Sequence, residues 1–288
     1  MNKFLKDFIS YLSSEKGLAK NTIEAYKRDI CCFLNFINEE PTSIQESHLL
    51  NFLRFQSEGE YATSSIARSF IALKVFFQFL KREEIMGYNP MLHLETPKFW
   101  QLIPEVLTTH EIERLLDAPN LTTEKGCRDK AILELLYSSG LRVSELCSLT
   151  LYSIDDCTVR VKGKGGKERI VPVGKKALLA IDDYLYRFRD HAGSMRNEIL
   201  FVGARGKAVS RFEIWRMIKT YGSAVGIKKN ISPHTLRHCF GTHLLDKGAD
   251  LRVIQEMLGH ASISSTDRYT HISTNKLINS FNQFHPRP

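Results

Sequence analysis

The stretch Thr158-Val-Arg-Val-Lys-Gly-Lys-Gly-Gly-Lys-Glu-Arg-Ile-Val-Pro-Val173 decides the fold class of this chain. Its halves, Thr158–Lys162 and Glu168–Val173, alternate apolar and polar residues with the period of a β-strand, and glycines lie between them. The stretch therefore predicts a β-hairpin with Lys164 at its tip. Elsewhere the apolar residues recur mostly at helical spacing, so we expect a mainly α-helical protein with a small β-hairpin or sheet in its C-terminal domain.

The first hundred residues predict helices. Apolar residues form a single stripe along Ile23–Ile37, and a second long helix is expected from Thr63 through Leu80. The rest of the surface of this second helix carries Arg68 and Lys74 among other basic residues, which is typical of a helix face in water. This part of the chain therefore predicts a helical domain.

A domain boundary is expected near residue 100. Asn89-Pro90 ends the helical pattern, and the residues after it include two further prolines and show no clear period. We predict a helical domain over residues 1–98, a linker at 99–104, and a mixed domain over 105–288.

Helix signals return in the second domain. Helices are expected at Glu111–Leu116 and at Arg128–Ser138, the latter ended by Gly140. Ser232 and the proline after it predict a capped helix start. Leu251–Leu258 reads as another helix, with an aspartate before it and a glycine after it.

The charge of the chain lies in its C-terminal part. The 288 residues carry a net charge of +8, with 40 Lys and Arg against 32 Asp and Glu. Residues 1–98 hold 12 basic and 12 acidic residues, so the whole excess falls after them. A footprint for a polyanion is therefore expected on the C-terminal domain.

The remaining composition is that of a soluble intracellular protein. No stretch approaches the roughly 18 apolar residues of a membrane span. Asp7 lies where a signal peptide would have its apolar run. The six cysteines show no paired C-x-x-C spacing, which favours buried free thiols in a reducing cytoplasm.

Six polar residues could together break a phosphodiester with a tyrosine nucleophile. A tyrosine hydroxyl has an unperturbed pKa of about 10 and is therefore a weak nucleophile at neutral pH. It needs cations that stabilise the developing charge and a group that protonates the departing oxygen. The candidates are Arg142, Lys164, His234, Arg237, His260 and Tyr269.

Each candidate taken singly also has an ordinary structural explanation. Arg142 is spaced to form a surface salt bridge with Glu145, and its remaining donors would then be free for an anion. Lys164 could be an exposed hairpin tip and His260 a residue after a helix end. A buried tyrosine with a bonded hydroxyl would explain Tyr269.

The histidines of the C-terminal part do not fit a zinc site. His234 and His238 have i,i+4 spacing, and His243 follows them. The zinc-protease pattern requires a glutamate directly after the first histidine, where this chain has Thr235. We expect no metal and no other cofactor.

The six residues resemble the tyrosine recombinase (phage integrase) family when they are taken in order. The motifs are Gly-Leu-Arg142-Val-Ser-Glu145, Pro-His234-Thr-Leu-Arg237-His, Leu-Gly-His260 and Tyr269-Thr-His271, and the likeness extends over essentially the whole chain. Within the family the chain is most similar to the bacterial Xer recombinases. The resemblance implies a helical core-binding domain that clamps DNA and a catalytic domain that carries the six residues.

The resemblance also implies a reaction and partners. Tyr269 would form a 3′-phosphotyrosyl intermediate, Arg142 and Arg237 would grip the phosphate, and Lys164 would protonate the leaving oxygen. The partners would be double-stranded DNA, a second, XerC-like Xer recombinase in a heterotetramer, and a DNA translocase such as FtsK. The expected task is the resolution of chromosome dimers at a dif-like site, without a cofactor.

Several alternatives stay open on sequence alone. A mobile-element integrase and a type IB topoisomerase use the same chemistry, and a non-catalytic protein could clamp DNA without cutting it. The segment of about 272–288 would be exchanged between protomers. Its apolar stripe could equally pack in its own core; it consists of Leu277, Ile278, Phe281 and Phe284.

Overall fold

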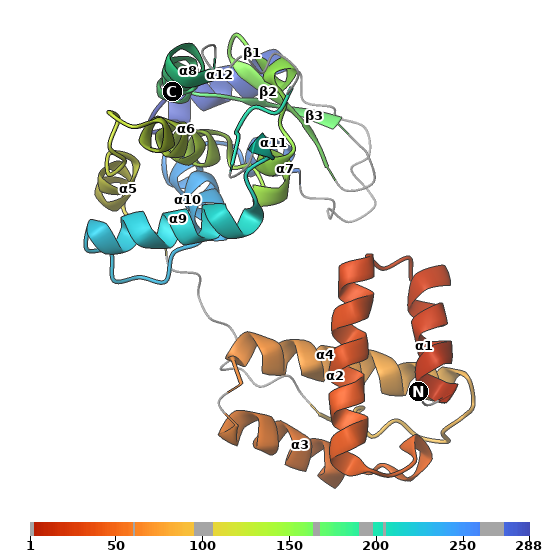
Figure 1. Ribbon diagram of the computed structural model, residues 1–288. Coiled ribbons are helices and arrows are strands. Elements are labelled where there is room, and N and C mark those ends of the chain that lie inside the picture. The colour runs from red at the N-terminus through yellow and green to blue at the C-terminus, as the bar shows by residue number, and fades with distance from the viewer. Residues whose placement is uncertain are drawn as a thin grey trace. The chain divides into compact units, whose positions relative to one another are not determined.

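The computed structural model describes residues 3–59, 61–94, 106–163, 168–189, 198–203, 206–259 and 274–288. The chain forms two compact units, Met1–Ile103 and Pro104–Pro288, and each is described by itself (Figure 1). The linker predicted at 99–104 lies outside the described residues. Within the described ranges, no helix is both long and apolar enough to cross a membrane.

The first unit is a small helical domain with an aromatic core. Its helices are α1 (Lys3–Ser14), α2 (Lys20–Ile37), α3 (Glu46–Glu58) and α4 (Thr63–Arg82), with a 3-10 turn at Pro41–Ser43. The two helices predicted here, 23–37 and 63–80, correspond to α2 and α4. Phenylalanines fill the core in edge-on and tilted contacts, among them Phe8, Phe33, Phe52, Phe76 and Phe77.

One basic residue of α4 has a specific partner. Arg68 donates from Nε and Nη2 to the two carboxylate oxygens of Asp29 on α2, at 2.8 and 3.0 Å. Because Asp29 is nearly buried, this pair ties α4 to α2 inside the unit. The Arg68 side chain is 41% exposed, so it lies on a solvated face as the sequence predicted, but the sequence did not show its partner Asp29.

The second unit is mainly helical with one small sheet. Its helices are α5 (Thr109–Leu116), α6 (Glu124–Ser139), α7 (Val143–Cys147), α8 (Lys175–Tyr184), α9 (Arg211–Ala224), α10 (Pro233–Asp246), α11 (Leu251–Leu258) and α12 (Thr274–Phe284). A 3-10 turn lies at Leu151–Ser153 and a π-helical turn at Leu185–Arg189. The mainly α class with a small β element is confirmed.

The predicted hairpin forms the sheet. Strands β2 (Thr158–Lys162) and β3 (Glu168–Pro172) pair antiparallel, with Val161 opposite Arg169 and Val159 opposite Val171. A two-residue strand, β1 (Ile154–Asp155), joins the other edge of β2 and is too short for the sequence pattern to show. The hairpin turn at residues 164–167, with Lys164, lies outside the described residues.

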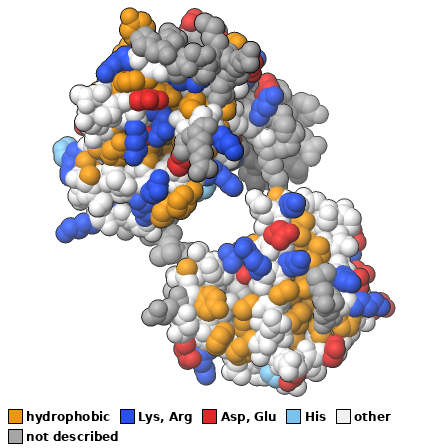
Figure 2. All heavy atoms as spheres, viewed as in Figure 1, with side chains coloured by type: hydrophobic (Ala, Val, Ile, Leu, Met, Phe, Trp, Pro, Cys, Tyr) orange, Lys and Arg blue, Asp and Glu red, His pale blue; other side chains and the backbone are white. Residues whose placement is uncertain are grey.

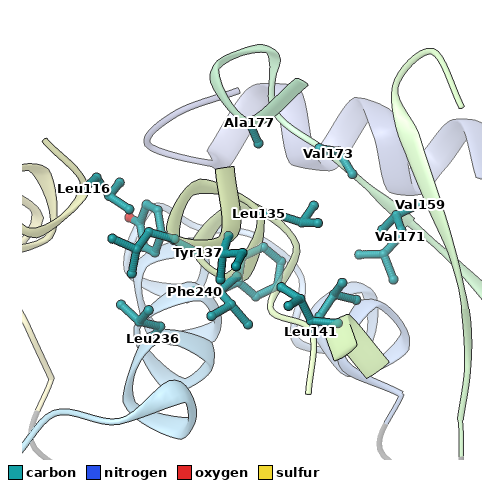
Figure 3. Close-up of a cluster of buried hydrophobic side chains, with 14 of the residues drawn as sticks. Leu116, Leu135, Tyr137, Leu141, Val159, Val171, Val173, Ala177, Leu236 and Phe240 are labelled. Atoms are coloured by element: carbon teal, nitrogen blue, oxygen red, sulfur yellow. The ribbon is translucent and has the colours of Figure 1, made fainter. Parts of the chain in front are cut away.

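Helix α6 is the centre of the second unit. It is buried along most of its length and packs between α8 and α10. Figure 3 shows Leu135 and Tyr137 of α6 with Leu236 and Phe240 of α10 in this core. From Ala131 to Ser139 every residue of this helix is buried, so packing on all sides holds its end at Gly140 in position for the site that follows.

The capping signals read from the sequence are confirmed in this unit. The side chain of Ser232 accepts a hydrogen bond from the backbone N–H of Thr235, and Pro233 occupies the first turn of α10. Asp250 caps α11, which ends at Gly259 with a positive φ of 63°. Gly140 ends α6 with φ 57°, and a Cβ there would collide with the Phe240 ring. These glycines set the directions in which the chain leaves α6 and α11.

The end of the chain packs on its own unit. Leu277 and Phe281 of α12 are buried, and α12 lies against β3 and α11. The apolar stripe therefore packs in its own core in this chain, whereas exchange of the segment between protomers stays a prediction. Arg287, which follows α12 in the chain, belongs to a group of ion pairs that we call the tail cluster, made of Asp117, Lys130, Glu134 and Arg287.

The cysteines are free, as predicted, but not uniformly buried. Cys127 and Cys239 are buried, whereas Cys157 is exposed and the other three are intermediate. Cys157 lies in the turn between β1 and β2, where Asp156 and Thr158 flank it, and it is not covered by the core.

Candidate active site

Arg142 lies directly after the end of α6. The left-handed Gly140 turns the chain so that Arg142 becomes the residue before the first turn of α7. Glu145 accepts from the backbone N–H of Arg142 at 2.8 Å and from its Nη1 at 2.9 Å. The predicted i,i+3 pair is confirmed. The remaining donors are not all free, because Nη2 donates to the backbone oxygen of Gly259 at 2.8 Å.

Arg237 comes to the same place from α10. Its Nη1 donates to the backbone oxygen of Gly140 and its Nη2 to that of Leu258, each at 2.5 Å. These carbonyls stand at the C-terminal ends of α6 and α11, where the helix dipole is negative. Two helix ends therefore hold a guanidinium that is only 8% exposed.

The surroundings of Arg237 disfavour its positive charge. Burial of the guanidinium and then the nearby charge of Arg142 lower the pKa of Arg237 from its ordinary 12.5 to about 10. The group is still protonated at neutral pH. The positive charges of Arg142 and Arg237 lie close together, and the one negative charge of Glu145 does not balance them. An anion that binds here would therefore be stabilised.

A third arginine, Arg169 of β3, completes the group. It donates from Nη1 and Nη2 to both carboxylate oxygens of Glu145, at 2.7 and 2.9 Å, and from Nε to the backbone oxygen of Met257 at 3.1 Å. Burial of the Glu145 carboxyl opposes its ionisation, but the Arg169 side chain and the Arg142 backbone N–H outweigh burial and lower the pKa of Glu145 from 4.5 to about 2. Glu145 is therefore a carboxylate throughout the physiological range.

We call these four side chains the arginine cluster: Arg142, Glu145, Arg169 and Arg237. The cluster contains three guanidinium groups and one carboxylate, so its side chains carry a net charge of +2. Arg142 is the most accessible member, with its side chain 36% exposed. The cluster can bind a phosphate directly through Arg142. The less exposed Arg169 and Arg237 add positive electrostatic potential at that position, and their hydrogen bonds hold the cluster in place.

Sequence reasoning missed Arg169. The register places it on the same face of the hairpin as Val159, Val161 and Val171, which are buried, whereas Ile170 points outward and is 37% exposed. An arginine in the core-facing row beside an outward isoleucine reverses the expected alternation. That reversal was the signal available in the sequence.

His234 lies in the first turn of α10 and is exposed. It lines a shallow groove together with Val143, Arg211, Phe212 and Trp215. Val143 follows Arg142 directly, so the groove runs beside the arginine cluster. In the view of Figure 2, the second unit shows several groups of Lys and Arg side chains with few Asp and Glu among them.

Three of the six predicted residues fall outside the described parts of the chain: Lys164, His260 and Tyr269. The structure brings Arg142 and Arg237 together and places His234 on the adjoining groove. The chain positions that lead into the other three are described. Lys162 and Glu168 end the strands on either side of the turn that holds Lys164, and Gly259 precedes His260.

The histidines considered for zinc do not gather in one place. His234 and His238 are exposed, whereas His243 is buried with its ring nitrogens on the Tyr137 hydroxyl at 2.9 Å and the Leu107 carbonyl at 2.8 Å. Across the ranges that the structure describes, no group of three or more His, Cys, Asp or Glu could hold a metal ion.

Comparison with known proteins identifies the family. The model of the phage integrase family matches residues 105–276, and that of the phage integrase N-terminal SAM-like domain matches residues 5–84. The chain belongs to the tyrosine recombinase (phage integrase) family. It is a tyrosine-type site-specific DNA recombinase, and the resemblance read from the sequence is confirmed.

Relatives of known name are similar to this chain over its whole length. Tyrosine recombinase XerD of Listeria monocytogenes serotype 4b is 40% identical over 299 residues, covering 100% of both chains. XerD of Chlamydia pneumoniae is 45% identical over 291 residues, covering 98% of this chain and 95% of the relative. Three segments of the sequence had favoured XerD over XerC: Tyr137–Leu146, Gly248–Ile254 and His285–Pro288.

Solved structures share the fold. The XerA recombinase is 31% identical over 100% of both chains, with a TM-score of 0.50. A lambda integrase dimer bound to a COC′ core site gives a TM-score of 0.71 at 21% identity, covering 94% of this chain and 98% of the other. The two-domain recombinase architecture is therefore shared with proteins of this family.

Proposed function

We propose that this recombinase cuts and rejoins DNA through Tyr269, and that the arginine cluster binds the phosphate under attack. The observation that carries the proposal is the net charge of +2 on buried and half-buried side chains held by two helix ends. A surface salt bridge needs no such excess. A site built for a phosphodiester does, because negative charge grows on the phosphorane oxygens.

The two substrate-facing arginines divide the work. Arg142 keeps part of its donor set unused and is partly exposed, so it can grip a non-bridging oxygen directly. Arg237 is held from behind by the carbonyls of Gly140 and Leu258, which leaves its other N–H donors for the phosphate. Guanidinium groups carry a permanent positive charge in proteins, so both arginines can stabilise the negative charge of the phosphate.

The remaining roles follow from side-chain chemistry and chain position. Lys164, between glycines at the hairpin tip, protonates the departing 5′-oxygen, because a mobile ammonium can follow a leaving group. His234, in the first turn of α10, assists proton transfer at the tyrosine, and His260 donates a hydrogen bond to the phosphate.

The reaction balances without a cofactor. The Tyr269 oxygen forms a bond to phosphorus and loses its proton, the bond from phosphorus to the 5′-oxygen breaks, and that oxygen takes up a proton. The 3′-phosphotyrosyl ester keeps the energy of the broken bond. A 5′-hydroxyl of another strand can therefore attack it, and the ligation needs no ATP.

The substrate and partners of the recombinase are inferred from its relatives. A related structure is described as XerH bound to a palindromic difH substrate, and full-length relatives that are 40% and 45% identical are XerD proteins. We infer a dif-like chromosomal site, chromosome dimers as the DNA resolved, and a cytoplasmic location. The assembly is a tetramer with a second, XerC-like recombinase, under the control of a translocase such as FtsK.

Trapping of the covalent intermediate tests the proposal. A duplex carrying the candidate dif-like site, nicked beside the scissile phosphate, lets the cut fragment diffuse away and retains the adduct. The unmodified enzyme should give a covalent complex, with and without the second recombinase compared in parallel. Tyr269→Phe should give none, and an adduct that persists in this variant would rule out Tyr269 as the nucleophile.

The leaving-group proton is tested separately. Lys164→Ala should cut a normal phosphate slowly and a 5′-sulfur substrate rapidly, because a thiolate leaves without a proton. No rescue by sulfur would remove Lys164 from the acid role. Relaxation of a plasmid without the site would instead favour a topoisomerase, and binding without any adduct would favour a non-catalytic clamp.

A further inference from the structure

We propose that Arg169 is a positioning residue that neutralises Glu145, so that the charge of Arg142 is available to the scissile phosphate. The inference rests on the proposed function. Arg169 is not one of the six residues of the proposed chemistry. It is also not an ordinary exposed strand residue, because its side chain is largely covered.

The geometry shows that Arg169 is turned into the protein. Its side chain is 12% exposed, compared with 36% for Arg142. Both of its terminal nitrogens are turned to Glu145 in a parallel, bidentate arrangement, and Nε bonds Met257. A Cβ added at Gly259 would come within 3.0 Å of its Cδ and Nε, so the guanidinium lies directly against the end of α11.

The guanidinium of Arg169 is important because of its contact with Glu145. Its carboxylate accepts two bonds from Arg142 and two from Arg169. Without Arg169, a buried carboxylate would retain Arg142 as its one remaining partner among these four side chains. It would then compensate the charge of Arg142 and draw its guanidinium inward, away from a phosphate.

The cluster charge leads to the same conclusion. With Arg169 the four side chains carry +2, and without it they would carry +1. The lowered pKa of Arg237 reflects the two neighbouring guanidiniums as well as burial. Arg169 therefore sets the field that the phosphate meets, without touching the phosphate.

Arg169 also joins three parts of the chain. It stands in β3, which follows the hairpin turn that holds Lys164; it grips Glu145 at the start of α7; and it closes the end of α11, after which the chain continues to His260. A displacement of about 1 Å in such a scaffold can cost about 10²-fold in rate.

The first test compares two substrates. The probe is the nicked dif-like duplex, with either a normal phosphate or a methylphosphonate at the scissile position; the methylphosphonate has lost one charged oxygen and is neutral. Arg169→Gln should lower covalent-complex formation on the normal phosphate by about 10²-fold, with DNA affinity little changed. On the methylphosphonate the defect should largely disappear, as it should for Arg142→Gln, because little charge remains to be stabilised.

The second test restores the charge balance within the protein. In Arg169→Gln/Glu145→Gln the orphaned carboxylate is gone, so cleavage of the normal phosphate should recover above the level of Arg169→Gln alone. Arg169→Lys, which keeps the charge and loses the bidentate contact, should lie between the unmodified enzyme and Arg169→Gln. Circular dichroism melts of all variants show which of them are folded.

The outcomes separate the two proposals. Equal defects of Arg169→Gln on both substrates, or no recovery in the double variant, would mean that Arg169 only stabilises the fold. If Arg169→Gln does not fold, the comparison of Arg169→Lys on the two substrates decides in the same way. Failure of the unmodified enzyme to form any adduct overturns the proposed function itself, and this inference with it.

Discussion

The arginine cluster and the tail cluster lie in the same unit and use the same side-chain chemistry, yet they differ in charge balance. In the tail cluster Arg287 contacts Glu134 at 2.6 Å, and Lys130 contacts Glu134 at 3.0 Å and Asp117 at 2.7 Å. Two positive charges meet two negative ones. The arginine cluster has three positive charges and one negative charge.

The difference in charge balance distinguishes a structural group of ion pairs from a group that can bind a ligand. A balanced group has no electrostatic reason to bind anything else. This one, in which Glu134 and Arg287 are buried and Asp117 is exposed, fixes the end of the chain against α6. An unbalanced one is held in place by helix-end carbonyls, which compensate the positive charge only in part. Buried charge alone is therefore a weak sign of a site, whereas uncompensated buried charge indicates a ligand of the opposite sign.

The largest expected effect is on stability and falls on the balanced cluster. Arg287→Gln leaves Glu134, whose side chain is 2% exposed, without its closest partner. Because Lys130 still contacts Glu134 at 3.0 Å, the unfolding free energy should fall by about 3 kcal/mol, the lower end of the range for breaking a buried pair. Urea unfolding measures it, and Arg82→Gln, at an exposed ion pair, is the control that should stay near the unmodified protein. A small effect of Arg287→Gln would remove the structural role given to the tail cluster.

The next effect is on rate and falls on the unbalanced cluster. Arg237→Lys keeps the charge and loses the planar donor set, so cleavage should fall by about 10²–10³-fold while DNA affinity changes little. Single-turnover formation of the covalent complex and equilibrium binding at fixed salt measure the two. The matched variant Arg287→Lys should leave cleavage per folded molecule nearly unchanged. Equal losses of binding and cleavage in Arg237→Lys would show that this arginine only anchors DNA.

Acid should destabilise the two regions in different pH windows. The pKa of Glu145 is lowered from 4.5 to about 2. Its contribution to the unfolding free energy is therefore complete above pH 4.5 and is lost as the pH falls towards 2. Burial lowers the pKa of His285, beside the tail cluster, from 6.5 to about 4, so its contribution is lost between pH 6.5 and 4. Each shift corresponds to about 3 kcal/mol of unfolding free energy.

Unfolding titrations at a series of pH values test both windows. Glu145→Gln should flatten the curve below pH 4.5, and His285→Phe should flatten it between pH 6.5 and 4 while keeping a ring to stack on Phe281. His243 also has a pKa lowered by burial, so some slope should remain in the upper window. Slopes that do not change in these variants would contradict the assignments.

The smallest effect concerns a single methyl group. A Cβ at Gly174 would collide with the backbone oxygen of Arg287, so Gly174→Ala should cost about 1–3 kcal/mol of unfolding free energy. Gly241→Ala is the matched control, because its Cβ would make ordinary contacts of 3.4 and 3.7 Å with Leu258 and Ile254. That variant should gain up to about 1 kcal/mol from helix propensity. Thermal unfolding of both variants measures the opposite signs.

Local signals predicted much of this fold. Caps and glycines predicted the C-terminal end of α6, the start of α10 and both ends of α11, because these residues act on backbone groups within a few positions of themselves. The start of α6 was predicted at Arg128, whereas the helix begins at Glu124 after the cap Thr123. The hairpin was predicted from alternation and its glycines. The sequence missed β1, which has only two residues, and it missed the partner of Arg68, which lies 39 positions away.

The candidate site was predicted only in part. Arg142, His234 and Arg237 were found by motif, whereas Arg169 was read as a strand residue. Its role depends on Glu145, 24 positions earlier, and on Met257, 88 positions later. No local pattern relates such distant residues, although its place in the inward row of β3 was visible.

The sequence by itself determined the helical class, the hairpin, the helix ends and the family, because each depends on neighbouring residues or on motifs read in order. The tertiary structure decided which charges are compensated. Glu145 is shared by two arginines, Arg237 is held by two helix ends, and the tail cluster is neutral. These outcomes depend on electrostatic interactions between groups that only the folded chain brings within 3 Å of one another.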